Sequence, residues 1–499
     1  MMEQIINEII KAINCKINHF YIVGGMPRDL ILKKESNDVD IILPVPRDHP
    51  FFTINKKRQI KKSIGTVLKK IIVNGKSFKC EINPLQKEDI EKDLESRDLT
   101  INSIAYKVDI MSKKLEIFDP CGGINDLINH KLRCYQENNL AEDPIRMLRI
   151  YRFQSLLNFD IDTYTAISIS KHHAKINDAP KEMLYEELSK LFSGTYCVKA
   201  FRNMATSGLL SEMIPEMDPV INFLHQDPYH HHESVFEHSL QVLENCVQKN
   251  LSLEYRVAAF FHDISKPSVF DGKHYIKHET KGVKVTKNIL SRMRFPNDFI
   301  NNVSRIIDYH MMAFNSHKKF FEMRYNIGED KFKDQIQFIE ADKMATNQFW
   351  NQTQAFQDFV MNVNIVTRYD DCGFFERLEK LVNGKILLKI GLKSGPGFQN
   401  CLDYLKKYFF KKPDRLSERN IIKLLEQNLF FIGHYSHFKH GILQSKRIRE
   451  YIKGQVIYGL LEEGVELSFK SGIFYFNYFS KGEFISWEKE NRKYCCLFY

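Results

Sequence analysis

Apolar and polar residues in the first 135 positions follow two different spacings. Isoleucines recur at helical intervals across positions 5–13, with polar residues between them, which predicts an amphipathic helix. Short apolar runs bounded by turn-forming residues follow and predict β-strands. These runs span residues 20–25, 39–43, 65–73, 76–82 and 114–119. This part of the chain is therefore expected to form a mixed sheet with helices.

The later part of the chain has mostly helical spacing. Apolar residues recur at helical intervals from residue 140 to residue 425, with a Gly-rich interruption at 391–398. Residues 469–487 alternate again and contain glycines, which predicts hairpins. We therefore expect an α+β fold. Its expected parts are a head with a mixed sheet (1–135), a helical neck (136–215), a helical domain (216–350), a helical body or tail (351–429) and a small β-rich appendage of unknown role (430–499).

Composition narrows the class of protein. The chain has 499 residues, of which 43% are hydrophobic and 27% charged; this is typical of globular proteins and excludes fibrous or wholly disordered ones. A net charge of +10 suits a polyanionic partner, although many globular proteins are equally basic. The ten cysteines form no CxxC pair, which argues against a zinc ribbon or a thioredoxin-like site. The sequence shows neither a signal peptide nor a membrane-spanning run, so we expect a cytoplasmic protein with no membrane contact, and no protein partner can be read from it.

Two glycines follow the first expected strand. Gly24 and Gly25 allow the backbone to approach a ligand closely, and Arg28 comes next at the start of an expected helix. A helix N-terminus with an arginine binds phosphate well. A plain strand–turn–helix corner is the structural alternative.

Two aspartates open the next expected strand. Asp38 and Asp40 are two residues apart, so their side chains are expected on one face of the sheet. Mg²⁺ prefers one or two carboxylates together with substrate phosphates. Glu81, on a later strand, is a candidate third carboxylate. A solvent-exposed strand edge would account for the same residues without a metal.

The order of these motifs resembles the bacterial-type tRNA nucleotidyltransferase and poly(A) polymerase family. The resemblance covers residues 20–155 and also includes segments 97–102, 119–123 and 142–149. It implies a nucleotidyltransferase head that adds CCA to tRNA from CTP and ATP. Asp38, Asp40 and Glu81 would be catalytic, and the two aspartates would hold Mg²⁺. The sequence departs from the family at Leu99, Ser103 and Gln86, where Phe, Ala and Arg are common.

The segment 142–149 supports an interpretation of its own. Asp143 and Arg146 are three residues apart and would lie on one side of a helix. Cytosine and adenine both present an exocyclic amine beside an acceptor nitrogen, which a carboxylate and an arginine can recognise together. Capping of the helix by Asp143 before Pro144 is the structural alternative. The nucleotide-binding residues implied by the resemblance are Gly24, Gly25, Arg28, Arg97, Asp98, Asn102, Glu142, Asp143, Arg146 and Arg149.

Histidines and aspartates are spread over the helices of residues 225–345. The His262-Asp263 pair ends an apolar helix, and its companions resemble the HD phosphohydrolase superfamily. The resemblance implies a metal site for Ni²⁺, Mn²⁺ or Fe²⁺ formed by His238, His262, Asp263 and Asp342. His278 and His310 are expected as second-metal or phosphate contacts, and Lys266 is expected beside the ligands. Each histidine taken alone is more often an ordinary helical residue. Ser265 departs from the Gly common in the motif, and residues 230–232 are expected to form a surface turn.

Basic residues are the candidates for RNA contact. No acidic residue stands between His49 and Cys80, whereas lysines and arginines are frequent there. Residues 386–398 are similar to the segment that follows the catalytic domains in this family, and lysines at 406, 407, 411 and 412 follow among aromatics. Three alternatives remain open: a poly(A) polymerase of the same family, an HD phosphohydrolase with a non-catalytic head, and a non-enzymatic RNA-binding protein.

Overall fold

A computed structural model describes the chain at residues 2–13, 15–54, 66–87, 89–224, 234–312, 314, 316–347, 349–389, 397–428, 465–470, 473–480 and 483–490. These residues form two compact units. The first comprises Met1–His310 with Phe338–Asn347, and the second comprises Met311–Gln337 with Gln348–Tyr499. Residues 230–232, the basic residues between 56 and 62, and the glycines at 391 and 395 lie outside the described residues.

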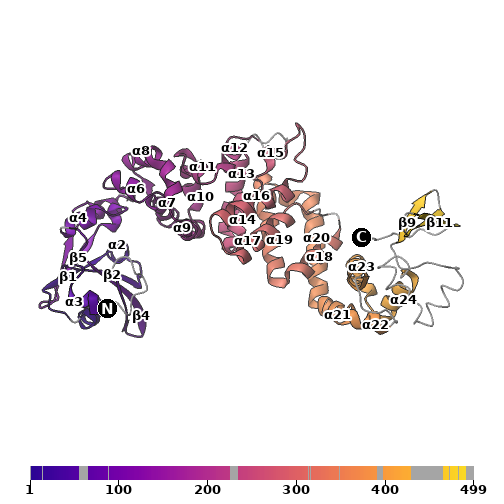
Figure 1. Cartoon of the computed structure of the whole chain (residues 1–499), viewed down its shortest axis with the longest axis horizontal. Coiled ribbons are helices and arrows are strands. Elements are labelled where there is room, and N and C mark those ends of the chain that lie inside the picture. The colour runs from indigo at the N-terminus through magenta and orange to yellow at the C-terminus, as the bar shows by residue number, and fades with distance from the viewer. Residues whose placement is uncertain are drawn as a thin grey trace. The chain divides into compact units, whose positions relative to one another are not determined.

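The head is built on a six-stranded mixed sheet (Figure 1). Its strands, in spatial order, are β3 (Val67–Val73), β4 (Lys76–Pro84), β2 (Asp38–Leu43), β1 (His19–Val23), β5 (Ala105–Asp109) and β6 (Leu115–Phe118). β2 and β4 are parallel, and the other neighbours are antiparallel. All the strands predicted for the head are present. β5 was not predicted, because only Ala105 and Val108 in it are buried and no clear alternation results.

The two faces of the head sheet differ in character. The head helices are α1 (Met2–Ile13), α2 (Gly25–Ile31), α3 (Pro50–Ile54), α4 (Ile90–Glu95) and α5 (Gly123–Ile128). The predicted helix α1 buries its isoleucines against the sheet face that carries Val39 and Ile41. Side chains alternate along β2, so Asp38 and Asp40 point to the opposite face.

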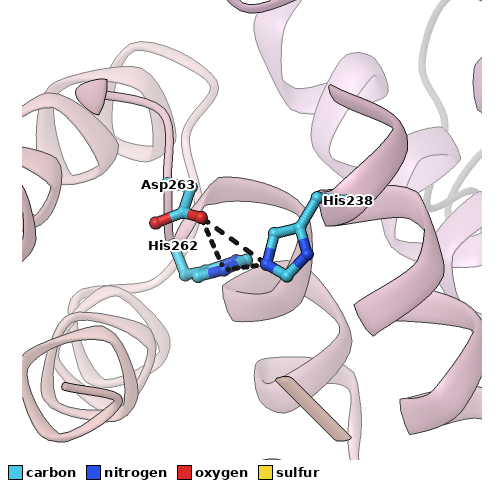
Figure 2. Close-up of side chains that lie close together, drawn as sticks. All are labelled: His238, His262 and Asp263. Atoms are coloured by element: carbon cyan, nitrogen blue, oxygen red, sulfur yellow. Dashed lines mark hydrogen bonds and ion pairs between the residues drawn. The ribbon is translucent and has the colours of Figure 1, made fainter. Parts of the chain in front are cut away.

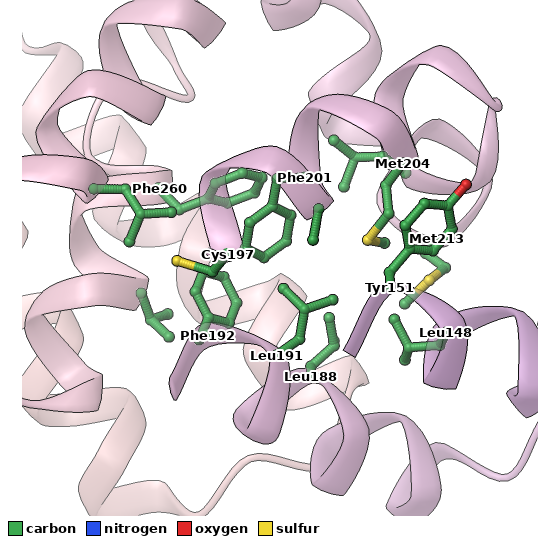
Figure 3. Packing of buried hydrophobic residues seen from close by; sticks show 14 of the residues in the cluster. Leu148, Tyr151, Leu188, Leu191, Phe192, Cys197, Phe201, Met204, Met213 and Phe260 are labelled. Atoms are coloured by element: carbon green, nitrogen blue, oxygen red, sulfur yellow. The ribbon is translucent and has the colours of Figure 1, made fainter. Parts of the chain in front are cut away.

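The helices that follow the head share one hydrophobic core. The neck contains β7 (Lys131–Leu132), α6 (Asn138–Glu142), α7 (Ile145–Leu157), β8 (Asp160–Ile161), α8 (Thr163–His172), α9 (Lys181–Ser193), α10 (Cys197–Thr206), α11 (Leu209–Met213) and α12 (Asp218–Ile221). The next set contains α13 (Val235–Gln248), α14 (Leu253–Phe261), α15 (Lys266–Val269), α16 (His278–Arg292), α17 (Asn297–Tyr309) and the end of α19 (Glu329–Thr346). Phe192, Phe201 and Phe260 come from α9, α10 and α14, and their ring centroids lie 4.3 to 5.6 Å apart (Figure 3). Neck and following helices are thus packed as one body.

The second unit is helical and ends in a small sheet. Its further elements are α18 (His317–Ile327), α20 (Gln354–Asp371), α21 (Phe374–Leu381), α22 (Gly384–Lys389), α23 (Gly397–Lys411), α24 (Glu418–Asn428), β9 (Val465–Lys470), β10 (Ile473–Ser480) and β11 (Glu483–Glu490). Phe321 in α18 packs against Phe374, Phe375 and Phe410. The predicted hairpins are present as the antiparallel strands β9 to β11. None of the helices in the described ranges is both long and apolar enough to cross a membrane.

Candidate active sites

Three carboxylates lie on one face of the head sheet. The register of the parallel pair β2–β4 sets Asp40 beside Glu81 and Asp38 beside Lys79. Partial burial raises the pKa of Asp40, and Glu81 and Asp38 raise it further, while Arg97 and Lys79 oppose them. Mutual repulsion of this kind is relieved by a bound cation, so the three oxygen-bearing side chains fit Mg²⁺.

The turn after β1 approaches one of these carboxylates closely. Gly24 has a φ of 76°, and a Cβ at this position would stand 2.5 Å from Asp40 Oδ2. A glycine is therefore required both by the backbone conformation and by the space available. The sequence predicted that this turn approaches a ligand, which stays a prediction; the structure shows that Gly24 approaches the Asp40 carboxylate.

The guanidinium of Arg28 connects the turn to the next candidate residues. Arg28 Nη1 donates to Asn102 Oδ1 at 2.7 Å, and its Nε and Nη2 donate to Asp29. Asn102 Nδ2 in turn donates to Asp98 Oδ1 at 2.9 Å. Arg28 also lies over the ring of Phe153 in α7, 5.0 Å from its centroid. The structure thus brings Arg28, Asp98 and Asn102 together.

Asp98 is buried and paired with the neck. Arg149 Nε donates to Asp98 Oδ2 at 2.7 Å. Burial alone would raise the pKa of Asp98, but Arg149 and Asn102 outweigh it and hold the pKa at about 2. The carboxylate is therefore charged at neutral pH and ties α7 to the loop after α4.

Glu187 completes this network and was not predicted. Its carboxylate lies 3.0 Å from Arg152 Nη1 and 3.9 Å from Arg149 Nη1. Glu187 is buried on α9. Its sequence signal is an acidic residue among the apolar positions of an amphipathic helix, since Leu184, Leu188 and Leu191 are buried beside it.

Asp143 and Arg146 lie together at the start of α7. Arg146 Nε stands 3.3 Å from Asp143 Oδ2, while Arg146 Nη1 donates to the Ser96 carbonyl at 2.7 Å. The described N-terminus of α7 has no side-chain cap, so capping does not explain the Asp143 carboxylate. The Asp143 side chain is 47% exposed and therefore accessible to a ligand.

Two other candidates are held by neighbours close to them in the sequence. Glu142 accepts from Asn138 at 2.6 Å, and Arg97 donates to Asp93 at 3.1 Å. These bonds hold the Glu142 side chain along α6, and they hold Arg97, in the loop that carries Asp98, against α4.

The segment 119–123 is a scaffold for the loop 97–102. The Asp119 carboxylate accepts from the amides of Gly123 and Ile124 at 2.7 and 2.9 Å, which caps α5. A Cβ on Gly123 would stand 2.1 Å from the Thr100 carbonyl oxygen. This motif therefore supports the position of Asp98 and Asn102 from behind.

A second cluster lies among the helices after the neck. His238 comes from α13, and His262 and Asp263 follow the end of α14; the three side chains point toward one another (Figure 2). His262 Nε2 lies 3.3 Å from His238 Nε2 and 3.1 Å from Asp263 Oδ2. Asp342, on α19, adds a carboxylate oxygen 3.1 Å from His238 Nε2. All four are buried.

Asp263 also belongs to a second group. Its Oδ1 lies 3.4 Å from His278 Nε2 and 3.8 Å from His310 Nε2, and these two nitrogens are 3.2 Å apart. In each group of three the possible ligand atoms all fall within 4.8 Å of one another. One carboxylate therefore faces two candidate cation positions.

The histidines are oriented with Nε2 toward the cluster. Nδ1 of His262, His278 and His310 lies 2.6 to 2.9 Å from a backbone carbonyl three residues earlier. A carbonyl only accepts, so Nδ1 carries the hydrogen and Nε2 offers a lone pair to a metal. Facing Nε2 atoms at 3.2 and 3.3 Å fit a cation held between them.

Burial and the neighbouring carboxylates shift the pKa values of the histidines in this cluster. Burial would lower the pKa of His262, but Asp263 and Asp342 raise it to about 10. Burial lowers the pKa of His238 to about 4 and that of His310 to about 3. A divalent cation competes with the proton held by His262.

Two lysines pair with the carboxylates of this cluster. Lys266 Nζ lies 2.7 Å from Asp263 Oδ2, and Lys343 Nζ lies 2.8 Å from Asp342 Oδ2. Lys266 was a predicted site residue; Lys343 was not, although it follows Asp342 directly in the sequence. Ser265, the departure from the common motif, donates to the His278 carbonyl at 2.6 Å and so connects the His-Asp turn to α16.

Comparison with known proteins agrees with this arrangement. Residues 20–133 match the poly(A) polymerase head domain, residues 158–221 the probable RNA and SrmB-binding site of polymerase A, and residues 235–347 the HD domain. The chain is therefore similar to tRNA nucleotidyltransferases and poly(A) polymerases in its head, its RNA-binding segment and its HD domain. The predicted family resemblance and the α+β fold class are thus confirmed.

Two of the similar proteins are each named multifunctional CCA protein. The multifunctional CCA protein of Nitrosospira multiformis is 28% identical over 309 residues, which cover 58% of this chain and 72% of the relative. That of Cupriavidus metallidurans is 29% identical over 298 residues, covering 56% and 71%.

Solved structures of CCA-adding enzymes have a fold similar to that of this chain. The Bacillus stearothermophilus CCA-adding enzyme in complex with CTP aligns with a TM-score of 0.61 at 20% identity, covering 86% of this chain and 97% of that one. The Thermotoga maritima CCA-adding enzyme complexed with tRNA aligns with a TM-score of 0.55 at 17% identity, covering 86% and 95%. These likenesses show a shared fold.

Proposed function

We propose that this chain is a tRNA nucleotidyltransferase that adds or repairs the 3′-terminal CCA from CTP and ATP. One observation supports this proposal most directly. Asp38, Asp40 and Glu81 lie on one face of the head sheet, next to the hydrogen-bonded residues Arg28, Asn102 and Asp98. The names of the relatives and of the structures with CTP and tRNA support the substrates. Poly(A) addition is the alternative within the family.

In this mechanism the head residues hold the reacting groups in line. Asp38 and Asp40 would hold two Mg²⁺, which when bound neutralise charge on the attacking and leaving oxygens. Arg28 and Asn102 orient the triphosphate and sugar of the incoming nucleotide. The 3′ hydroxyl oxygen forms a bond to the α-phosphorus, its proton passes to Glu81, and the bond to pyrophosphate breaks.

Base choice is assigned to the start of α7. Asp143 accepts from the exocyclic amine of cytosine or adenine, and Arg146 donates to the neighbouring ring nitrogen. The 3.3 Å pair between them keeps both groups on one side of the helix. Because Arg146 also donates to the Ser96 carbonyl, its orientation is tied to the loop that carries Asp98.

A primer-extension assay tests this function. The substrate is a tRNA transcript that ends at the discriminator base, with Mg²⁺ and labelled CTP, ATP or both. Addition of two cytidines and one adenosine, followed by a stop, is the expected result. A long adenosine ladder from ATP alone would instead identify a poly(A) polymerase, and absence of any addition would refute the proposal.

The histidine cluster supports a second, metal-dependent activity on phosphate esters. Asp263 faces both His238–His262 and His278–His310, an arrangement suited to two divalent cations such as Ni²⁺, Mn²⁺ or Fe²⁺. Cyclic or terminal phosphates of RNA ends are the proposed substrates. Metal analysis of the purified protein tests it, together with two assays: ring opening to a phosphomonoester on RNA with 2′,3′-cyclic ends, and phosphate release on RNA with terminal phosphates. Wild-type protein that binds metal but hydrolyses neither kind of RNA end would contradict this activity.

A further inference from the structure

The sheet face that carries the carboxylates continues onto two exposed lysines. The register of β3, β4 and β2 aligns Lys70, Lys79 and Asp38 in one row across the strands. Leu68, Glu81 and Asp40 form the adjacent row. Residues paired across strands share a face, so both lysines lie on the same face as the carboxylates.

The two lysines differ in their surroundings. Lys79 Nζ lies 2.7 Å from Glu81 Oε1, and this bond raises the pKa of Lys79. Lys70 is exposed, and no carboxylate of the described residues lies within ion-pair distance of it. Like charges directly opposite each other in a sheet are unfavourable, and an anion bound between them removes that cost.

The residues assigned to the nucleotide lie on the other side of the carboxylates. Gly24 and Arg28 follow β1, and Asn102 precedes β5. The sheet order is β3-β4-β2-β1-β5, so β2 and its aspartates separate the nucleotide side from the lysine side.

Phosphoryl transfer requires the attacking and leaving oxygens on opposite sides of the phosphorus. A triphosphate on the β1–β5 side therefore leaves the β4–β3 side for the attacking 3′ hydroxyl. We propose that Lys70 and Lys79 bind backbone phosphates at the 3′ end of the acceptor RNA. This assignment rests on the proposed nucleotidyl transfer and names the RNA contacts of the same site.

Ile72 lies on the same face as Lys70 and is 64% exposed, so it offers an apolar contact to a base of the acceptor RNA.

Steady-state kinetics of full-length variants test the assignment. Lys70→Gln is the principal variant because Lys70 does not contact a catalytic carboxylate, and Lys79→Gln accompanies it. Each is expected to raise the KM for tRNA roughly threefold to tenfold and to leave the KM for CTP unchanged. The slope of log KM against log salt should decrease by about 0.7 for each phosphate that the protein no longer neutralises. Lys76→Gln is the matched control, since Lys76 is exposed on the same strand as Lys79 but on the other face.

A modified RNA gives an independent readout. A neutral methylphosphonate at one of the last two linkages should weaken wild-type binding, and Lys70→Gln should weaken binding of that RNA little further. Fully additive effects at both linkages would overturn the assignment. A raised KM for CTP in place of tRNA would assign the lysines to the triphosphate and also overturn it. Wild-type protein that adds no nucleotide refutes the proposed function itself, whereas an active wild type with unaltered variants refutes only the lysine assignment.

Discussion

Two residues of the head, Gly24 and Asp98, are constrained by close contacts with their neighbours. Gly24 has a left-handed backbone, and a Cβ at this position would stand 2.5 Å from Asp40 Oδ2, so any side chain would displace that carboxylate. Asp98 is fully enclosed and remains charged because Arg149 and Asn102 bind it. The geometry of the candidate active site therefore depends on the absence of a side chain at Gly24 and on the carboxylate of Asp98.

Replacing Gly24 by alanine is expected to impair nucleotide addition. The new Cβ would displace the Asp40 carboxylate, and a displacement of about 1 Å costs on the order of 100-fold in rate. The measurement is kcat for CTP addition, with circular dichroism as the check on folding. Gly75→Ala is the control, because Gly75 also has positive φ but a Cβ there meets nothing within 4 Å. Near-normal activity of Gly24→Ala would contradict the close approach.

Asp98→Asn is expected to lower stability in a pH-dependent way. The folded pKa of about 2 lies below the unfolded value, so the charge stabilises the fold above pH 4 and the effect fades as pH falls toward 2. The variant should lose about 2 kcal/mol at pH 7, and roughly half of that difference should vanish by pH 3. Urea unfolding at several pH values measures it. A difference that does not change between pH 7 and pH 3 would show that the charge is not responsible.

Among the elements, α6 and α7 of the neck position the loop after α4. Asn139 donates to the carbonyls of Glu95 and Arg97, and Arg146 donates to that of Ser96. The loop therefore takes its conformation from helices that follow it in the chain, and the two groups assigned to base choice lie at the junction of these helices.

Asp143→Ala is expected to relax the choice of nucleotide more than it weakens RNA binding. The carboxylate is about half exposed and pairs only with Arg146 among the described residues, so its removal leaves the fold intact. The measurement compares incorporation of all four nucleotides, with tRNA binding as the control. A variant that still admits only CTP and ATP would exclude Asp143 from base recognition.

Phe260→Ala tests whether the neck helices and the helices of the HD domain (residues 235–347, here called the HD helices) form one body. The ring contacts Phe192 and Phe201 across α9, α10 and α14, and it is 1% exposed. The truncation should cost about 3–5 kcal/mol. Hydrogen exchange should show reduced protection in the neck helices as well as in the HD helices. Destabilisation confined to the HD helices would contradict a shared core.

At the scale of the whole molecule, the two candidate metal sites rest on separate parts of the first unit. The carboxylates of the head lie on a sheet whose other face packs on α1, whereas the histidine cluster lies within the core that contains Phe260. The ligands assigned to one site are all different from those assigned to the other. Their activities are therefore expected to be separable.

Exchange of one ligand at each site should remove one activity at a time. Asp40→Asn is expected to abolish nucleotide addition and to spare metal-dependent hydrolysis of phosphate esters at RNA ends. His262→Ala should do the reverse and should also reduce the bound metal. Chelator treatment followed by Mg²⁺ alone should restore only nucleotide addition. Parallel loss of both activities in either variant would show that the sites are coupled.

Local spacing was sufficient to predict five of the six head strands and the mostly helical character of residues 140–425, and the order of the motifs was sufficient to predict the family resemblance. The strands that carry Asp38, Asp40 and Glu81 were predicted because apolar alternation reports burial within a few residues. The strand β5 was missed because tertiary contacts, and not its own pattern, stabilise it. Glu187 was missed because its partners Arg149 and Arg152 lie more than thirty residues earlier in the chain.

By itself the sequence determined which side chains are available: three carboxylates on strands, an Asp–Arg pair one helical turn apart, and the His-Asp motif. Only the tertiary structure decided which of them meet. The register of β4 places Lys79 beside Asp38, and the packing of α13, α16 and α17 brings three histidines to Asp263 and its neighbour His262. The physical reason is that spacing along one element reports its own buried face, whereas register and helix packing arise from contacts between elements far apart in the chain.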